Sequence, residues 1–360
     1  MNLSQTAEKM MNKYLILQHP GANSAYYTSS EELALAELQI ACNRLQTRSE
    51  KIQAEEIADL RYLTFEVETE LTESDIKILS RLSFFFALFQ QVNSNDPMLL
   101  RPIARAPFEF VDEKISSLLK YAGKTNVQFT RMMVNVALLS SDFHYEDRIR
   151  LLDPVAGKAT TMFEGIIQGF NVFGVEIEHK SVHEATIFFK KYLEREKFIH
   201  TFDKHKSGGN QKTEIITQYK FSYAKTREEF DVEETNKKFQ MICGNSQNVS
   251  DYFKNESMHL IVGDLPYGIA HGNTVGKKFK SVTRNPSELL DLSLPDWYKL
   301  LIPGGVIVVA WNSYVVGFDI LNEIFKKNGF RVLDAEPYTK FEHLVDKSIR
   351  RDIVVAKKGT

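Results

Sequence analysis

The stretch that decides the fold runs Leu151-Leu152-Asp153-Pro154-Val155-Ala156-Gly157-Lys158-Ala159-Thr160. It begins as an apolar strand, turns through small residues and enters a helix, which is the place where open α/β sheets bind ligands. The turn is not a Walker A loop, because Leu152 stands where the first glycine is needed and Ala159 follows Lys158 where Ser or Thr belongs. It is not the dinucleotide fingerprint either, because it holds a single glycine.

Short apolar runs recur around this turn, and helical stretches separate them. The runs are 150–152, 172–175, 239–243, 259–262 and 306–310. Continuous apolar strands of this kind are typical of a parallel sheet covered on both faces, so residues 124–360 are expected to form a doubly wound α/β domain. The segment at about 199–237 is too long for a simple loop and is expected to be an insertion, such as a solvated hairpin. A nucleic-acid grip is less favoured there, because its lysines are interleaved with glutamates.

The first 92 residues follow a different pattern and are expected to form a smaller α+β domain. Apolar residues at 14–17 and alternation at 62–67 predict strands, with a helix between them that ends near Leu45. Thr72-Glu73-Ser74-Asp75 resembles a capping box that opens a second helix, before an aromatic strand at 84–89. This order, completed by a split strand near 52–57, is compatible with a ferredoxin-like module. Residues 93–123 are rich in turn signals and are expected to be a linker.

Composition excludes several classes of protein. The chain has 360 residues and 45 Lys and Arg against 47 Asp and Glu, so any contact with nucleic acid must come from a local basic patch. Two distant cysteines, Cys42 and Cys243, favour neither a disulfide framework nor a cysteine zinc site, which fits the cytoplasm. No apolar run of membrane-spanning length and no secretory leader is recognisable, so no membrane contact is expected.

Two acids at strand ends predict a nucleoside pocket. Glu176 ends the second apolar run, where an acidic side chain is placed to accept hydrogen bonds from both ribose hydroxyls. Asp153, in the first turn, is placed to face an ammonium group or a bound water. Each acid alone would more often be a helix cap or a surface charge, but together they favour a pocket for a cationic nucleoside.

The most specific signal is Ile261-Val262-Gly263-Asp264-Leu265-Pro266-Tyr267-Gly268. An apolar strand ends at Asp264, Pro266 stiffens its exit, and Tyr267 is presented at the carboxyl edge of the sheet. The Asp264 carboxylate and the Leu265 carbonyl can accept the hydrogens of an exocyclic amine, while Tyr267 stacks on the flat base. The alternative is a proline-containing turn with a packed tyrosine.

These segments resemble class I S-adenosylmethionine-dependent methyltransferases that act on amines, whose nucleophile motif is (Asp/Asn/Ser)-Pro-Pro-(Tyr/Phe). The variant at 264–268 is more similar to that of the tRNA guanosine 2-amino methyltransferases than to that of DNA adenine enzymes. The resemblance covers about 124–360 and implies a Rossmann-like sheet, S-adenosyl-L-methionine as cofactor and RNA, with tRNA favoured, as partner. It implies four catalytic residues, which are Asp264, Leu265, Pro266 and Tyr267. Many relatives carry a THUMP domain, for which residues 90–124 leave too little sequence.

The resemblance also implies the cofactor contacts. Residues 153–160 correspond to the methionine-binding loop, 245–246 to the adenine-contacting turn, and 123–129 to a cofactor-contacting helix entry. The implied cofactor-binding residues are Phe129, Asp153, Val155, Ala156, Gly157, Thr160, Glu176, Ile177, Asn245, Ser246 and Asp264. Two departures stand out: Lys158-Ala159 replaces a small residue and glycine in the loop, and Asn245 replaces the common Asp.

Basic residues near the same edge are candidates for binding substrate phosphates, although a solvated surface is an equal alternative. They are Lys277, Lys278, Lys280 and Arg284, together with Arg350-Arg351 before the last apolar run. His271 and His343 have no spaced partners, so no metal site is predicted.

The expected function is methyl transfer to an exocyclic amine, with the 2-amino group of guanosine in tRNA as the favoured acceptor. The alternatives are a DNA adenine 6-amino methyltransferase, a protein-amine methyltransferase, and a non-catalytic RNA-binding factor that keeps the fold with a degraded cofactor loop.

Overall fold

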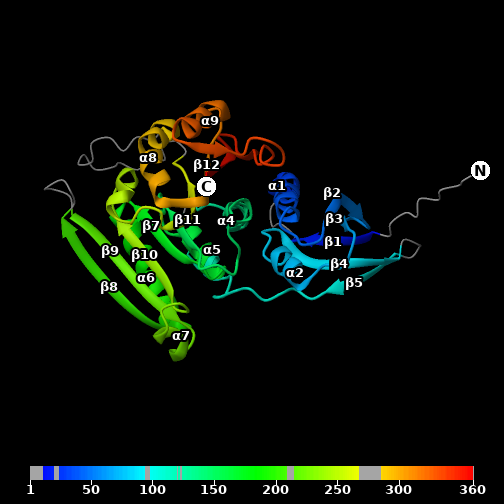
Figure 1. Cartoon of the computed structure of the whole chain (residues 1–360), viewed down its shortest axis with the longest axis horizontal. Helices are drawn as coiled ribbons and strands as arrows, with labels where there is room; N and C mark the ends of the chain where they lie inside the picture. Colours follow the sequence, from blue (N-terminus) through cyan, green and yellow to red (C-terminus); the bar gives the residue numbers. More distant parts are fainter. Residues whose placement is uncertain are drawn as a thin grey trace, which may run out of the picture. The chain divides into compact units, whose positions relative to one another are not determined.

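The structure is a computed structural model. It describes residues 11–19, 24–93, 98–119, 121, 124–208, 215–266 and 285–359. The chain divides into two compact units, Met1–Phe108 and Glu109–Thr360, each with its own sheet (Figure 1). None of the helices in the described ranges is long and apolar enough to cross a membrane.

The first unit is an antiparallel sheet of five strands with two helices, and its strand order is β2-β3-β1-β4-β5. Its elements are β1 (Asn12–Gln18), α1 (Ser24–Cys42), β2 (Ser49–Ile57), β3 (Leu60–Val67), α2 (Glu73–Leu79), β4 (Phe85–Asn93) and β5 (Leu99–Ile103). The predicted capping box is confirmed. The Asp75 amide donates to the Thr72 hydroxyl at 3.2 Å, and the Thr72 amide donates to the Asp75 carboxylate at 3.0 Å.

The expected linker 93–123 is corrected in part. Leu99–Ile103 pairs with β4 and belongs to the first sheet. A strand at this position covers backbone groups of β4 that would otherwise form an open edge. The turn signals at Pro102 and Pro107 hid this strand, because proline is tolerated on edge strands.

The second unit is built on a mixed sheet of ten strands, in the order β13-β15-β12-β11-β6-β7-β10-β9-β8, with β14 paired to β15. The strands are β6 (Arg150–Asp153), β7 (Asn171–Glu176), β8 (Ile199–Gly208), β9 (Ile215–Ala224), β10 (Lys237–Cys243), β11 (Met258–Asp264), β12 (Leu301–Asn312), β13 (Phe330–Val332), β14 (His343–Asp346) and β15 (Ile349–Lys358). The helices are α3 (Ile115–Leu118), α4 (Val127–Ser140), α5 (Thr160–Ile167), α6 (His179–Arg195), α7 (Arg227–Asp231), the 3-10 helix η1 (Ser246–Asp251), α8 (Pro286–Leu300) and α9 (Phe318–Lys327).

The five predicted apolar runs form the parallel centre of this sheet, which confirms the α/β class. Strands β10, β7, β6, β11 and β12 pair in parallel in that order. From β6 the chain moves outward to β7 and β10, and it then returns to β11 and β12 on the other side of β6. The boundary between β6 and β11 is therefore the topological switch point, where sheets of this kind bind ligands beyond the carboxyl ends of their strands.

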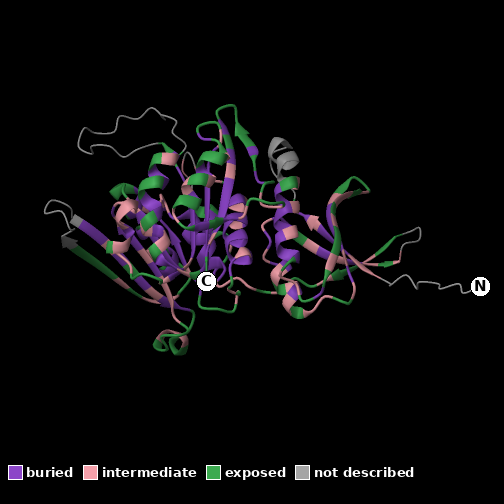
Figure 2. Ribbon diagram, turned by 45° about the horizontal axis from the view of Figure 1, so that its top comes forward, coloured by how far each residue is buried: buried purple, intermediate pink, exposed green. Residues whose placement is uncertain are grey.

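Helices cover both faces of the parallel strands (Figure 2). On one face, Trp297 of α8 and Phe325 of α9 join the buried cluster around Ile307. On the other, Phe163 of α5 and Phe189 of α6 stack on Phe239 of β10, with ring centroids 6.2 and 4.3 Å apart. Burial on both faces explains why these strands are continuous apolar runs.

The expected insertion is a hairpin, but it is not merely solvated. Strands β8 and β9 pair antiparallel, and β9 pairs antiparallel with β10, so the hairpin widens the main sheet. The alternate residues Tyr219, Phe221 and Tyr223 are at most 2% exposed. Their burial gives the hairpin a core of its own beneath α6.

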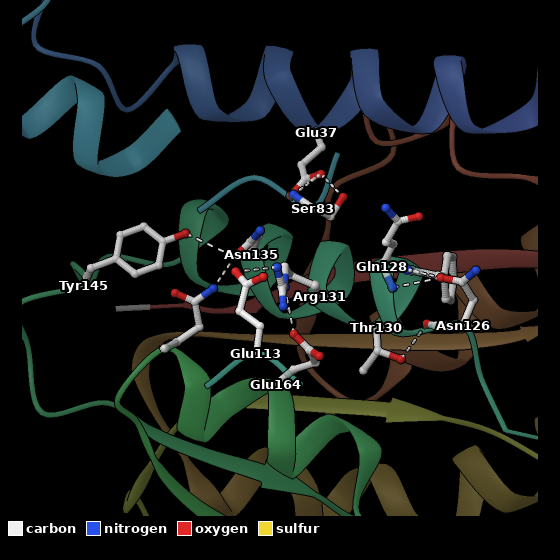
Figure 3. Close-up of polar contacts among 12 residues, drawn as sticks. Glu37, Ser83, Glu113, Asn126, Gln128, Thr130, Arg131, Asn135, Tyr145 and Glu164 are labelled. Atoms are coloured by element: carbon white, nitrogen blue, oxygen red, sulfur yellow. Dashed lines mark hydrogen bonds and ion pairs between the residues drawn. The ribbon is translucent and has the colours of Figure 1, made fainter. Parts of the chain in front are cut away.

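Helix α4 is tied to α5 by a buried ion pair. Arg131 Nε donates to Glu164 Oε2 at 2.8 Å, and Arg131 Nη1 donates to Glu113 Oε1 at 3.0 Å (Figure 3). The Glu164 side chain is 0% exposed. A carboxylate buried so completely depends on its cationic partner. The pair therefore fixes α4 and α5, the two helices whose first turns border the site described below.

Replacing Arg131 by Met should lower the free energy of unfolding by about 3 kcal/mol, because it leaves the Glu164 carboxylate buried without a cation. Urea unfolding followed by tryptophan fluorescence measures this, since both tryptophans, Trp297 and Trp311, lie in the second unit. The double variant Arg131→Met, Glu164→Leu should recover most of the loss. An Arg131→Met single variant as stable as the unmodified protein would contradict the ion pair's role.

Candidate active site

Polar residues gather where the parallel strands end. Asp153 ends β6, Glu176 ends β7, Asp264 ends β11, and Asn245 follows β10. Because neighbouring parallel strands end at the same edge of a sheet, these residues share one edge. Asp153 and Asp264 belong to β6 and β11, the strands that flank the switch point.

The turn after β6 has an unusual backbone. Gly157 and Ala159 both lie in the left-handed region, at φ 49° and 69°. A Cβ atom on Gly157 would meet nothing within 4 Å, so this residue borders open space. A glycine is favoured here by its left-handed backbone conformation and not by a lack of room for a side chain. Ala159 adopts a conformation that favours glycine, which explains why glycine is the usual residue there in the proteins that the sequence resembles.

Glu176 holds this turn from the neighbouring strand. The Gly157 amide donates to Glu176 Oε2 and the Glu178 amide donates to Oε1, both at 2.8 Å. Burial raises the pKa of Glu176. Each carboxylate oxygen has a second lone pair, so Glu176 can still accept hydrogen bonds from a ligand.

Asp153 shapes the turn from within. It is 3% exposed, and its Oδ1 accepts a hydrogen bond from the Val155 amide at 3.0 Å. Burial raises the pKa of Asp153 to about 7, and the charges of Glu176 and Asp264 act in the same direction. Its direct contact with an ammonium group stays a prediction.

The other predicted residues of the turn are placed beside Asp153. Ala156 and Thr160 are 5% and 8% exposed, and the Ala156 amide donates to the Val175 carbonyl at 2.9 Å. Lys158 pairs with Glu184 of α6 at 2.6 Å. The positive charge that distinguishes this loop is therefore balanced locally.

Tyr121 belongs to the site, although sequence reasoning did not select it. Its hydroxyl lies 2.8 Å from Thr160 Oγ1, and Lys158 Nζ lies 4.7 Å from the centroid of its ring. Burial raises the pKa of Tyr121, and the nearby Asp153 and Asp264 carboxylates raise it further. A single tyrosine in an expected linker gave no sequence signal, since only the fold brings it to this edge.

Asp264 is held by two residues that are distant in sequence. Thr125 Oγ1 donates to Asp264 Oδ2 at 2.5 Å, and Arg351 Nη2 lies 4.0 Å from the same oxygen. The guanidinium carbon of Arg351 lies 4.8 Å from the centroid of the Phe129 ring. Phe129 is only 1% exposed, so its observed role is to support Arg351 from the core. Arg351, grouped by sequence with candidate phosphate contacts, is buried beside the acid instead.

Comparisons with known proteins add little to this geometry. No family model matches the chain, and no curated protein matches it. Among solved structures, TrmN from Thermus thermophilus is 11% identical with a TM-score of 0.43, covering 96% of this chain and 99% of that chain. An rRNA methylase from Streptococcus thermophilus is 10% identical with a TM-score of 0.34, covering 67% and 100%. An S-adenosylmethionine-dependent methyltransferase from Clostridium acetobutylicum is 13% identical with a TM-score of 0.33, covering 59% and 85%.

The segment after Asp264 is described only at its start. Leu265 is 1% exposed, and its amide donates to the Ala310 carbonyl at 2.9 Å, which fixes the backbone directly after the acid. Pro266 is exposed. The remaining predicted residues of this segment lie outside the described residues, and their roles stay predictions: Tyr267, His271, Lys277, Lys278, Lys280 and Arg284.

The turn after β10 is built by its own hydrogen bonds. The Asn245 side chain accepts from the Gln247 amide at 3.0 Å, and the Ser246 carbonyl accepts from Trp297 Nε1 at 2.8 Å. Asn245 thus caps η1 as an aspartate would. Ile177, at the end of β7, is 38% exposed. Contact of Ile177, Asn245 and Ser246 with an adenine ring stays a prediction.

The pH dependence of stability should reveal the buried state of Asp153. Its folded pKa of about 7 lies above the usual value of 3.8, so the folded protein holds a proton that the unfolded chain releases. The stability that this proton provides is complete below the unfolded pKa and is lost as pH rises through about 7. In melts between pH 5 and 8, the Asp153→Asn variant should therefore lose less stability with rising pH than the unmodified protein. If the stability of the two proteins fell equally with rising pH, the raised pKa of Asp153 would be refuted.

Proposed function

We propose that this chain transfers the methyl group of S-adenosyl-L-methionine to an exocyclic amine of an RNA base. The observation that supports the proposal is the meeting of the turn after β6, Glu176 and Asp264 at one edge of a doubly wound sheet, around its switch point. A nucleoside-binding acid, a close-approach turn and an acid for the amine are the three parts that this reaction needs.

The residues of the edge fit the proposed cofactor. Gly157 borders open space, so a ligand can approach the backbone of the turn. Glu176 can accept hydrogen bonds from ribose hydroxyls. Ile177, which follows β7, and Asn245 and Ser246, which follow β10, would contact the adenine ring. The carboxylates of Asp153, Glu176 and Asp264 give the edge a negative character that suits a cationic ligand. When bound, the cofactor supplies an electrophilic methyl group on a sulfonium.

Asp264 would orient the acceptor. Its carboxylate accepts a hydrogen bond from the amine, which turns the nitrogen lone pair toward the methyl carbon. As the nitrogen–carbon bond forms and the sulfur–carbon bond breaks, the amine proton passes to the carboxylate or to water. Methyl sulfonium is already reactive, so alignment of this kind supplies much of the rate enhancement, on the order of several kcal/mol. Thr125 and the amide of Leu265 keep the acid and its backbone in place.

The guanosine 2-amino group in tRNA is the acceptor that we favour, because the segment at 264–268 is more similar to the motif of those enzymes than to that of DNA adenine enzymes. A DNA adenine 6-amino methyltransferase is less favoured, since the described residues form no separate target-recognition domain beyond the β8–β9 hairpin and the first unit. The non-catalytic alternative depended on Lys158-Ala159. The turn keeps its shape with these two residues, because Ala159 takes the left-handed conformation and Lys158 pairs with Glu184.

The function is tested by methyl transfer. Purified protein should bind S-adenosyl-L-methionine in isothermal titration and transfer a tritiated methyl group to unmodified tRNA, giving 2-methylguanosine by mass spectrometry of nucleosides. Transfer to DNA with formation of 6-methyladenine would instead support a DNA adenine 6-amino methyltransferase. Absence of cofactor binding would refute the proposal.

The Asp264→Ala variant should lose turnover by at least about a hundredfold, because it removes the group that orients the amine. Its dissociation constant for S-adenosyl-L-methionine should stay within a few-fold, because the turn after β6 and Glu176 are intact. Asp319→Ala, at an exposed position of α9, serves as the control and should leave both values unchanged. Normal turnover by Asp264→Ala in the tritium assay would eliminate the role of this acid.

Thr125 should act as a positioning residue. Thr125→Val removes a hydrogen bond to a charged group and should lower kcat about tenfold, with a smaller change in KM. Thr125→Ser keeps the hydroxyl and should restore most of kcat. If Val and Ser variants behave alike, the hydroxyl does not orient Asp264.

A further inference from the structure

We infer that a face formed by α6 and the β8–β9 hairpin binds the phosphate backbone of the RNA that carries the target base. This hairpin face consists of Lys190, Phe202, Lys204 and Lys206, and the ring of Tyr219 lies buried beneath it. The inference rests on the proposed function for its choice of ligand, but it concerns a surface several strands away from the acids described above.

The strand register places the three β8 residues on one face. Phe202, Lys204 and Lys206 alternate along β8, and alternate residues of a strand point to the same side. Lys190 Nζ of α6 lies 5.4 Å from the centroid of the Phe202 ring, and Lys204 Nζ lies 5.0 Å from that of Tyr219. Three ammonium groups therefore line a surface whose floor is aromatic.

The glutamates that mask these lysines in the sequence lie elsewhere in the fold. Glu228 and Glu229 belong to α7, which follows the end of β9 where Ala224 pairs with Ile199 (Figure 1). Seven residues separate Ile199 from Lys206, a distance of about 23 Å along an extended strand. Asp203 alternates with Lys204 and points to the opposite face.

One acid of the described residues near the hairpin face is weakly coupled to it. Glu194 of α6 lies 3.8 Å from Lys190, and the two side chains are 53% and 40% exposed. Such exposed pairs contribute little and are screened by salt. Lys204 and Lys206 are exposed, and they form no ion pair with any residue in the described part of the chain. The hairpin face thus supplies the local basic patch that a chain of near-zero net charge needs for binding phosphates.

The hairpin face lies at the same edge of the sheet as the candidate active site. One row of paired residues runs from Lys206 through Thr217 and Cys243 to Glu176. This row spans three strand spacings, and Asp264 on β11 lies two strands further. The five spacings amount to roughly 24 Å, which is the length of about seven stacked nucleotides. An RNA strand whose target base lies near Asp264 can therefore continue along the edge and reach the lysines.

The combination of groups favours RNA over other polyanions. Ammonium groups beside an aromatic ring are typical of surfaces that follow a single-stranded nucleic acid, where phosphates meet the cations and a base stacks on the ring. Phe202 is half-buried and can take such a base, whereas Tyr219 is 2% exposed and supports the surface from below. His179 and His183, exposed at the start of α6 and stacked with ring centroids 6.4 Å apart, extend this character toward the carboxyl edge. An acidic protein segment would use the cations but not the Phe202 ring.

The test is RNA affinity in the full chain. The triple variant Lys190→Gln, Lys204→Gln, Lys206→Gln is compared with a control in which Lys299, Lys326 and Lys327, on α8 and α9, are changed to Gln. Binding of a fluorescein-labelled, unmodified tRNA mixture is followed by fluorescence anisotropy between 50 and 200 mM KCl. Dissociation constants should rise tenfold or more for the hairpin variant and less than twofold for the control. The slope of log Kd against log salt should fall by about 2, because each phosphate that a lysine no longer neutralises lowers it by about 0.7.

Two further measurements separate the outcomes. Urea unfolding by tryptophan fluorescence should be unchanged in the triple variant, and so should the dissociation constant for S-adenosyl-L-methionine. Loss of RNA affinity without any methyl transfer by the unmodified protein would support the hairpin face while refuting the proposed function. Methyl transfer with unaltered RNA affinity and salt slope in the triple variant would overturn the hairpin face alone. Competition by poly-L-glutamate as effective as that by RNA of equal charge would also overturn it.

Discussion

The hydrogen bond from the Gly157 amide to the Glu176 carboxylate couples the turn after β6 to the end of β7. It acts together with the bond from the Ala156 amide to the Val175 carbonyl, and both hold a left-handed turn in which Ala159 is strained. With both bonds, two adjacent strands of the parallel sheet fix one rigid edge. The ends of β10 and β11 adjoin this edge, so the proposed cofactor and acceptor positions depend on the same coupling.

Electrostatics at this edge follow from burial. Asp153, Glu176 and Asp264 converge, and burial raises the pKa of Asp153 and of Glu176. Two cations of the described residues nearby are already engaged, since Lys158 pairs with Glu184 and Arg351 lies beside Asp264. The described part of the edge is therefore suited to a positively charged ligand, and among the described residues the cations for the phosphates of a nucleic acid lie on another surface. The hairpin face provides such cations at the same edge of the sheet.

Stability and site geometry are linked through α4 and α5. The fully buried Glu164 requires Arg131, and together they hold the two helices whose beginnings carry Asn126 and Thr160. Asn126 caps α4 by accepting from the Gln128 and Phe129 amides at 2.8 and 3.2 Å. Thr125, which precedes this cap, is thereby presented to Asp264. A buried ion pair remote from the chemistry thus contributes to the orientation of the acid.

Local patterns in the sequence determined the class of the second unit, its five parallel strands, the capping box at Thr72 and the strand-end positions of the acids. Periodicity and turn chemistry are properties of neighbouring residues, so they can be read along the chain. The tertiary structure alone decided the partners of Asp264, because Thr125 lies 139 residues away and Arg351 enters from the last strand. It also placed Phe129 in the core, brought Tyr121 to the site, added Leu99–Ile103 to the first sheet and separated the lysines of β8 from the glutamates of α7. These relations join residues that are distant in sequence. Strand pairing brings such residues together, and the local sequence around each residue does not show which strand will pair with it.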